Sequence, residues 1–254
     1  MIMRIIAAVA LLTGAASAQW LTTKTPNVPR TADGKPNLTA PAPRLADGKP
    51  DLSGIWNPNP KYVRDIAVDL KPGEVPMQPW AEAVFKERLA GLHSYEEPDA
   101  NCLPQGVPKL DTAPAPWKLI QVPGQVVILY EAFTQFRQIF LDGRKLPVDP
   151  NPIWLGYSVG HWDGDTLVVE SNGFNGKAWL DQVGHPTTEK LRVTEKYRRT
   201  DFGHMQIEIT IDDPGAYTKP WTVKEGPTLL VDSELLEFVC SENEQDVKHM
   251  GTKK

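Results

Sequence analysis

The sequence lacks the excess of positive charge that proteins coating nucleic acids or anionic membranes need. Its 254 residues carry 27 Lys and Arg against 32 Asp and Glu, a formal net charge of −5 at pH 7. Clustered positive charge supplies most of the affinity of such proteins for phosphate groups. We therefore expect no nucleic-acid partner.

Long hydrophobic runs are also missing. The unbroken apolar run IIAAVALL covers residues 5–12, far short of the ~20 residues that a membrane-spanning helix needs. It follows Arg4 and precedes an Ala-Ser-Ala motif that ends at Ala18, an order typical of a cleaved signal peptide. We predict a signal peptide over residues 1–18 and a periplasmic or secreted protein with no stable membrane span. An uncleaved anchor is the alternative.

Cysteine is scarce, since the chain has two, Cys102 and Cys240. Two thiols of one exported chain usually pair, so we predict a disulfide between them. Neither cysteine lies in a CxxC motif or has a histidine at ligand spacing. A catalytic or metal-binding cysteine is therefore disfavoured.

Cofactor and metal motifs are absent as well. The sequence contains no Walker loop, no GxGxxG, no HExxH and no HxH, the spacings that mark nucleotide, dinucleotide and zinc sites. We accordingly expect no cofactor and no metal.

Two short motifs resemble functional motifs, but the residues around them do not support the function. GYSVG at 156–160 matches the G-x-S-x-G nucleophile elbow, which needs Ser158 on a turn followed by a helix, but a strand and an Asp-Gly turn follow instead. In HWDGD at 161–165, His161 and two aspartates could share an ion, although aspartates beside a hairpin turn are usually turn formers. Neither motif supports a site.

Proline, by contrast, is abundant at 24 residues, and this favours strands and turns over helices. One helix is predicted over 79–90, because apolar residues recur there at spacing four on one face. The remaining apolar stretches alternate and are separated by short turns, so we predict antiparallel strands. The predicted strands are 118–121, 126–133, 137–141, 155–162, 165–171, 190–200, 204–212, 220–224 and 234–241.

The domain organisation follows from this pattern. We predict a mainly β fold over 53–246, either a single antiparallel lipocalin-like barrel or a sandwich, with one amphipathic helix. Residues 247–254 form a tail. Residues 19–52 form an extended proline-rich arm, in which PRTADGKPNLTA at 29–40 recurs as PRLADGKPDLSG fourteen residues later. Each DGKP unit predicts a turn, and two copies are too few for a solenoid.

Charged residues on apolar strand faces give the main candidate site. Alternation places Glu131, Glu195, Arg199 and Glu237 on inward faces. Buried charges must pair, change protonation or line a solvated cavity. Glu195 and Arg199 lie about 13 Å apart along one strand, so their partners must come from neighbouring strands, and Arg137 is one candidate. We take Glu195, Arg199 and Glu131 as candidate catalytic residues, with glutamate as base and arginine stabilising an oxyanion.

Aromatic residues extend this candidate site. The chain has eight tryptophans, whose rings fill cores and also stack on flat ligands. Trp56, Tyr197 and Trp162 join Arg137 and Glu237 as candidate ligand-binding residues. Trp56 lies in a G-x-W motif, LSGIW, that resembles the start of the first strand of lipocalin-like barrels.

Several blocks together resemble one set of secreted bacterial proteins. These blocks are DGKPDLSGIW, RQIFLDGR, GHWDGDTLVVES, TEKYRR and CSEN, between residues 47 and 243. The resemblance implies secretion and a single β-rich domain, and it carries over no activity, cofactor or catalytic residue.

Three functions fit these observations. The first is a small-molecule binding protein whose cavity mixes tryptophans with the inward glutamates and arginines. The second is a cofactor-independent lyase, isomerase or hydrolase that uses the same charges as acid and base. The third is a structural or assembly factor of the cell envelope, with the arm as its docking segment. The ligand and the oligomeric state stay open.

Overall fold

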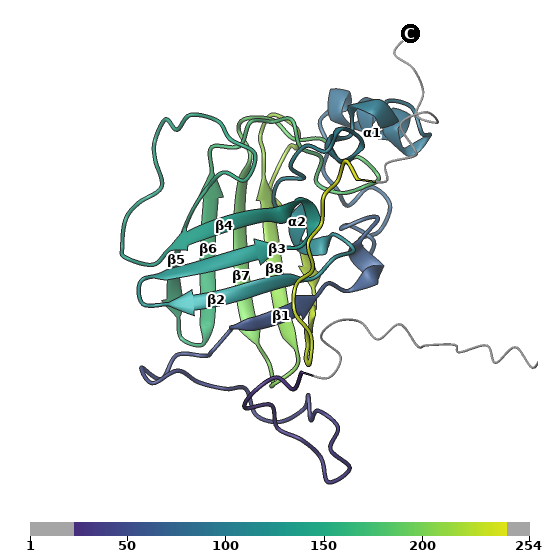
Figure 1. Cartoon of the computed structure of the whole chain (residues 1–254). Helices are drawn as coiled ribbons and strands as arrows, with labels where there is room; N and C mark the ends of the chain where they lie inside the picture. Colours follow the sequence, from purple (N-terminus) through teal and green to yellow (C-terminus); the bar gives the residue numbers. More distant parts are fainter. Residues whose placement is uncertain (1–22, 243–254) are drawn as a thin grey trace, which may run out of the picture.

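Within residues 23–242, ten strands form one sheet that curls into a half-barrel (Figure 1). The computed structural model describes these residues; the predicted signal peptide and the predicted tail lie outside the described part. The fold is thus mainly β, as predicted, and a single curled sheet takes the place of the two sheets of a sandwich.

The strand order in the sheet is β10-β1-β2-β3-β4-β5-β6-β7-β8-β9. The strands are β1 Gly54–Asn57, β2 Trp117–Val122, β3 Gln125–Tyr130, β4 Gln135–Phe140, β5 Tyr157–Asp163, β6 Thr166–Asn172, β7 Arg192–Arg199, β8 Met205–Asp212, β9 Trp221–Glu225 and β10 Thr228–Leu230. Among the described residues, the connections contain two α-helices, α1 Pro79–Leu89 and α2 Lys109–Thr112, and four short 3₁₀ helices, η1 Pro60–Tyr62, η2 Ser94–Glu96, η3 Pro98–Asn101 and η4 Ala132–Thr134.

One pair of neighbouring strands in the described sheet is parallel and the other pairs are antiparallel, which agrees with the predicted, mostly antiparallel β fold. β4 and β5 pair in parallel, with Ile139 opposite Ser158. Their connection, residues 141–156, is long and contains three prolines. A tight hairpin forces antiparallel pairing, whereas a long connection lets the chain cross to the other end of the sheet.

The sheet curls so that its two halves face each other across the core. Figure 1 shows β2, β3 and β4 running across β6, β7 and β8 at a steep angle. β10, at one end of the strand order, also contacts the turn between β7 and β8, because the Leu229 amide donates to the Gly203 carbonyl at 2.8 Å and His204 bridges to Thr228. Large side chains from both halves, including Trp56, Trp117 and Tyr197, fill the space between them.

The predicted last strand at 234–241 is wrong, because the structure has no regular structure there. The chain instead forms β10 earlier, at Thr228–Leu230, beside β1. Asp232 then adopts a left-handed conformation (φ 56°), which ends a strand. Backbone strain of this kind is uncommon outside glycine.

The alternating pattern of β7 and β8 is confirmed. Val193, Glu195, Tyr197 and Arg199 are buried on β7, and the alternate residues of β8 are buried in the same way. The two strands pair along their whole length. Burial of one face therefore fixes their register.

α1 matches the predicted helix to within one residue, but its apolar face is only partly covered. Ala81 is its one fully buried residue, while Trp80 is 45% exposed. The helix lies at one margin of the molecule (Figure 1). In the described residues, neither helix is long and apolar enough to cross a membrane.

The duplicated DGKP units fold into two copies of the same turn. Equivalent hydrogen bonds recur at an offset of fourteen residues, from Thr31 to Lys35 and from Leu45 to Lys49. The arginine that lies three residues before each DGKP unit also contacts the globular domain. Arg30 binds Asp232 at 2.6 Å, and Arg44 binds Asp165 at 2.9 Å, so the arm packs on the domain.

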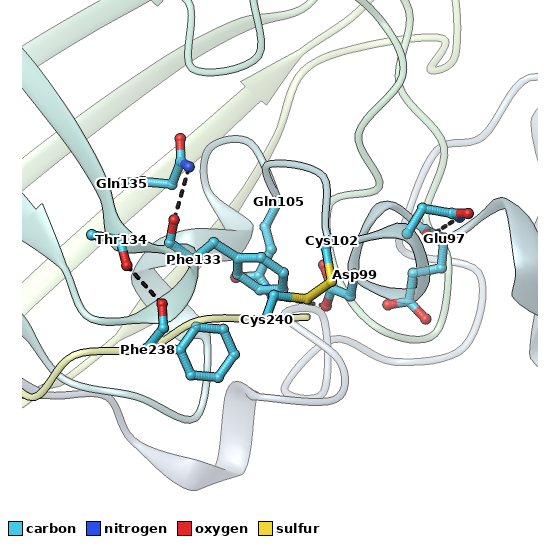
Figure 2. The surroundings of a disulfide bond; sticks show 10 residues. Glu97, Asp99, Cys102, Gln105, Phe133, Thr134, Gln135, Phe238 and Cys240 are labelled. Carbon is cyan, nitrogen blue, oxygen red and sulfur yellow. Dashed lines mark hydrogen bonds between the residues drawn. A yellow bond between two sulfur atoms is a disulfide. The ribbon is translucent and has the colours of Figure 1, made fainter. Parts of the chain in front are cut away.

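The predicted disulfide between Cys102 and Cys240 is confirmed. It joins η3 to the C-terminal segment, which lies against η4 through a Phe133–Phe238 ring contact at 5.4 Å (Figure 2). The bond closes a loop with a sequence separation of 138. On the chain-entropy account such a loop stabilises the fold by about 4–5 kcal/mol.

Candidate functional site

Arg137 and Glu195 form an ion pair in the interior of the half-barrel. Arg137 Nη1 donates to Glu195 Oε1 at 3.0 Å, and Nη2 donates to Oε2. Both side chains are at most 1% exposed. This pairing of β4 with β7 confirms Arg137 as the predicted partner of Glu195.

Hydroxyl groups complete the surroundings of this pair. Tyr197 donates to Glu195 Oε1 at 2.6 Å, and Arg137 donates to Ser158 at 3.1 Å and to Ser171 at 2.9 Å. The two serines lie opposite each other on β5 and β6. Ser158 is therefore a buried strand residue, not a nucleophile on a strand-to-helix turn.

A second carboxyl group, Asp111, enters the interior from α2. Tyr130 donates to its Oδ1 at 2.7 Å, and its Oδ2 lies 3.9 Å from Arg137. Burial and the negative charge of Glu195 raise the pKa of Asp111 to about 8. Burial also acts on Glu195, but Arg137 and Tyr197 outweigh it and lower that pKa. Glu195 is thus the ionised carboxyl of the pair.

Glu225 on β9 is a third buried carboxyl. Neither of its oxygens has a hydrogen-bond partner, and burial, followed by the charges of Asp111 and Glu195, raises its pKa well above the usual range. Burial without a hydrogen bond favours the neutral form of such a carboxyl group over the ionised form.

These interior contacts satisfy one another. Every nitrogen of the Arg137 guanidinium donates to Glu195 or to a serine, and both Glu195 oxygens accept. These bonds use four of the five N–H groups of Arg137, and the nitrogen that carries the fifth, Nη1, lies 3.9 Å from Asp111 Oδ2 inside the same cluster. The cluster therefore has the character of a structural link between the two halves of the sheet.

Arg199 and Trp56 lie together but apart from this cluster. The Arg199 guanidinium lies 5.0 Å from the centre of the Trp56 ring and donates to backbone carbonyls, among them that of Asp51 at 2.6 Å. Trp56 is fully buried and donates to the Leu52 carbonyl at 3.0 Å. Arg199 is thus placed on the inward face, as predicted, without reaching Glu195.

Three other predicted site residues lie elsewhere. Glu131 follows the end of β3. The buried residues of β3 are the even-numbered ones, whereas the prediction placed the odd-numbered face, which includes Glu131, inward. The Glu131 carboxylate accepts from the Leu236 amide at 2.8 Å. Glu237 is exposed and outside any strand. Trp162 is half-buried, with Lys49 Nζ 5.8 Å from its ring centre. The inward placement predicted for the two glutamates is wrong, because β3 ends before Glu131 and no strand forms at Glu237.

Asp181 and His185 form a second buried pair, in addition to Arg137 and Glu195. His185 Nδ1 contacts Asp181 Oδ2 at 2.6 Å, and both side chains are at most 2% exposed. Asp181 Oδ1 accepts from the amides of Gly184 at 3.0 Å and His185 at 3.1 Å, and Oδ2 also accepts from Ile66 at 3.2 Å. These bonds fix the carboxylate, which in turn fixes the imidazole with its proton on Nδ1.

The loop after β6 carries this pair, and neighbouring segments hold the loop in place. Gly184 has a left-handed φ of 96°, and a side chain there would meet Arg88 of α1 at 2.7 Å. Phe85 of α1 stacks on the His185 ring with centres 4.3 Å apart. Trp221 approaches the ring at 5.8 Å. The imidazole is therefore held between two aromatic rings.

Asp65 adds a second carboxyl group beside His185. One donor atom each of Asp65, Asp181 and His185 lies within 4.8 Å of the others. Asp65 is half-buried, and burial, together with the charge of Asp181, raises its pKa above the ordinary value. Among residues 23–242, no hydrogen bond occupies His185 Nε2, so this nitrogen is available as an acceptor.

Asp65 and His185 line a cavity of about 580 Å³, which we call the His185 cavity. Its apolar wall includes Leu70, Val75, Met77, Phe85 and Leu89. The charged groups that line it are Asp65 and Glu82 against Lys71 and Lys86, and Lys86 pairs with Glu82 at 2.6 Å. The cavity is thus formally neutral.

The same three residues fit a metal ion poorly. Catalytic zinc sites use three protein ligands and an open position. Asp181 already accepts four hydrogen bonds through its two oxygens, so it has the place of an outer carboxylate that orients the histidine. Only Asp65 and His185 remain as ligands. The geometry suits a histidine base better than a metal centre.

The sequence analysis identified neither the buried carboxyl groups Glu225 and Asp111 nor the Asp181–His185 pair, and the reasons differ. Glu225 continues the alternation of Trp221 and Val223 on β9, and this pattern would have identified it. Asp111 and the Asp181–His185 pair lie in connections with no periodicity. The spacing of four between Asp181 and His185 carries no signal outside a helix.

Comparisons with known proteins add no assignment. No family model matches this chain, and no curated protein or solved structure is significantly similar to it. The resemblance to secreted bacterial proteins stays a prediction, and the site rests on its own geometry.

Proposed function

We propose that this is an exported protein that binds a small, neutral, largely apolar molecule in the His185 cavity. The signal-like residues 1–18 and the disulfide, which is typical of an oxidising compartment, support export. The cavity supports the binding function.

The observation that carries the proposal is that a cavity with a largely apolar wall is also lined by two neighbouring polar side chains, Asp65 and His185. Small-molecule sites are concave, about 300–1,000 Å³ in volume, and mostly apolar with a few fixed polar groups. The His185 cavity, at about 580 Å³, has this size and this lining. His185 and Asp65 supply an acceptor and a carboxyl group that would orient the ligand.

A second candidate function, acid–base catalysis in the same cavity, is favoured by the Asp181–His185 hydrogen bond. A carboxylate on Nδ1 holds the imidazole in the tautomer in which Nε2 accepts a proton, and it stabilises the imidazolium that results. Asp65, with its raised pKa, would serve as the acid. The enzyme is then a cofactor-independent isomerase, lyase or hydrolase.

A matched pair of tryptophan variants tests binding. Thr218 lines the cavity at its mouth and is exposed, so Thr218→Trp should fill the cavity without burying new polar groups. Thr222, on the exposed face of β9, provides Thr222→Trp as the control. We expect neutral fragments that raise the melting temperature of the wild type to lose this effect in Thr218→Trp and to keep it in Thr222→Trp.

Two results would count against the proposal. One is a fragment library in which no neutral compound stabilises the wild type. The other is equal stabilisation of both tryptophan variants by every hit. His185→Gln and turnover by the wild type distinguish the two candidate functions. If His185→Gln binds the stabilising compounds as tightly as the wild type does, and the wild type converts none of them, acid–base catalysis is excluded and binding alone is retained.

A further inference from the structure

A second cavity lies between the first described residues of the arm and the β1–β10 edge. It measures about 370 Å³ and is lined by residues of the arm, β1, β10 and the β7–β8 turn. We call it the Arg199 cavity, because Arg199 is its most buried charged residue, 6% exposed. It shares no lining residue with the His185 cavity.

Within the described residues, the charge of Arg199 has no carboxylate partner. Its guanidinium donates to the backbone carbonyls of Asp51, Ser53, Asp201 and Phe202. These bonds occupy Nε, both hydrogens of Nη1 and one hydrogen of Nη2, which leaves one of the five N–H groups. Burial lowers the pKa of Arg199 to about 10, so it stays charged at pH 7.

The nearest acidic side chains are engaged elsewhere. Asp51 accepts from the Ser53 amide at 2.8 Å. Asp201 accepts from the amides of Gly203 and His204 and contacts the His204 ring at 2.7 Å. Neither carboxylate forms an ion pair with Arg199 in the part of the chain that the structure describes.

The charged residues that line the cavity are Lys24, Lys118 and Arg199 against Asp51 and Glu234, a formal surplus of one positive charge. Lys118 binds Glu234 at 2.6 Å, and Lys24 lies 3.5 Å from Asp232, which also binds Arg30. Arg199 is the buried member of this set, and among residues 23–242 it forms no ion pair with Asp51. A buried unpaired charge is costly, and a bound anion would offset that cost.

The rest of the lining is largely apolar. Val28 of the arm, Ile55 of β1, Phe202 and Leu229 contribute to it. The Phe202 ring centre lies 5.1 Å from the guanidinium. A ligand that fills this space needs an apolar body and a compact anionic end.

We propose that the Arg199 cavity binds a small organic acid, with its carboxylate at Arg199 and its apolar body under the arm. One unmatched charge and one available N–H group suit a singly charged carboxylate better than a phosphate, which carries more charge and more acceptor atoms. This site is separate from the His185 cavity and adds a second ligand class.

Isothermal calorimetry on the whole mature chain tests the proposal with three probes: octanoate, octanol and inorganic phosphate. We expect octanoate to bind at least about tenfold more tightly than octanol, which lacks the charge, and phosphate not to bind measurably. An octanol affinity equal to that of octanoate, or binding of phosphate alone, would overturn the proposal.

Variants locate the binding. Arg199→Gln should weaken octanoate binding about tenfold or more, and Val28→Trp should do the same by filling the cavity while leaving Arg199 intact. Val122→Trp, at an exposed position of β2, is the matched control and should bind octanoate as wild type does. If Arg199→Gln fails to fold, Val28→Trp alone tests the site. Octanoate binding by Val28→Trp with the affinity of the wild type would then overturn the proposal.

Thr218→Trp separates the two cavities. Octanoate binding should be unchanged in Thr218→Trp, whatever that variant does to neutral fragments. Loss of octanoate binding in Thr218→Trp would place the acid in the His185 cavity and overturn this proposal.

Discussion

Two buried aspartates of this chain have opposite surroundings. Asp181 accepts hydrogen bonds from three backbone amides and from His185, whereas Asp111 accepts one from Tyr130 and has an unpartnered Oδ2. Hydrogen bonds to an ionised carboxylate favour it, and burial without them disfavours it. At the residue scale, Asp181 therefore orients His185 as a carboxylate, and Asp111 stays protonated up to a higher pH.

The proton on Asp111 makes stability depend on pH. Its folded-state pKa is raised to about 8 from the ordinary value of 3.8, so its contribution to stability is complete below about pH 4 and is lost as the pH rises towards about 8. The loss amounts to about 1 kcal/mol per pH unit for one such group.

Asp111→Asn removes this titration and keeps an acceptor for Tyr130. The unfolding free energy of both proteins would be measured by urea titration at several pH values. We expect the difference, variant minus wild type, to increase as the pH rises from about 5 to about 8. Parallel curves for the two proteins would show that Asp111 does not hold its proton in the fold.

At the scale of elements, the duplicated turns of the arm provide an internal comparison. Each turn uses its arginine to contact an aspartate of the domain, but the surroundings differ. Arg30 and Asp232 are 23% and 18% exposed, and Thr25 adds further hydrogen bonds to Asp232. Arg44 and Asp165 are 53% and 55% exposed. Exposed ion pairs contribute little to stability.

We therefore predict different effects of the same substitution in the two turns. Arg30→Ala should speed hydrogen exchange of the first turn by about tenfold or more, whereas Arg44→Ala should change exchange of the second turn by less than about threefold. Exchange measured by mass spectrometry reports each turn separately. Equal effects in the two turns would mean that the burial of Asp232 does not fix the arm.

Elements that bury one face were predictable from the sequence, because burial leaves a period in the chain. β7 and β8 show this, and the inward position of Glu195 followed from the same alternation. Arg137 was one candidate partner, and it binds Glu195 from β4, which is not next to β7 in the sheet. The disulfide followed from cysteine number and compartment. Glu131 and Glu237 lie outside the strands. There the sequence still alternates between apolar and polar residues, but this alternation does not correspond to the two faces of a sheet.

The His185 cavity could not be predicted from the sequence, since it depends on contacts between distant segments. Asp65 precedes α1, whereas Asp181 and His185 follow β6. Their proximity depends on bonds between connections, such as that from the Val183 amide to the Arg64 carbonyl at 3.0 Å. Loops held by a rigid scaffold commonly carry functional residues, and they carry no periodic signal.

At the scale of the whole molecule, the sheet and the sites have separate roles. The interior between the two halves of the sheet is filled by side chains and by the Arg137–Glu195 pair, so it holds the fold together. Both proposed binding cavities lie where connections meet the sheet, one at α1 and the loop after β6, the other under the arm. Ligand binding is thus assigned to the loops of this protein, and stability to its strands.

A crystal structure of the mature protein soaked with its most stabilising neutral compound tests this assignment most directly. The account predicts density for the compound in the His185 cavity, with a polar atom within about 3.2 Å of His185 Nε2. Density for the compound between the two halves of the sheet, or at any site with the His185 cavity left empty, would contradict it.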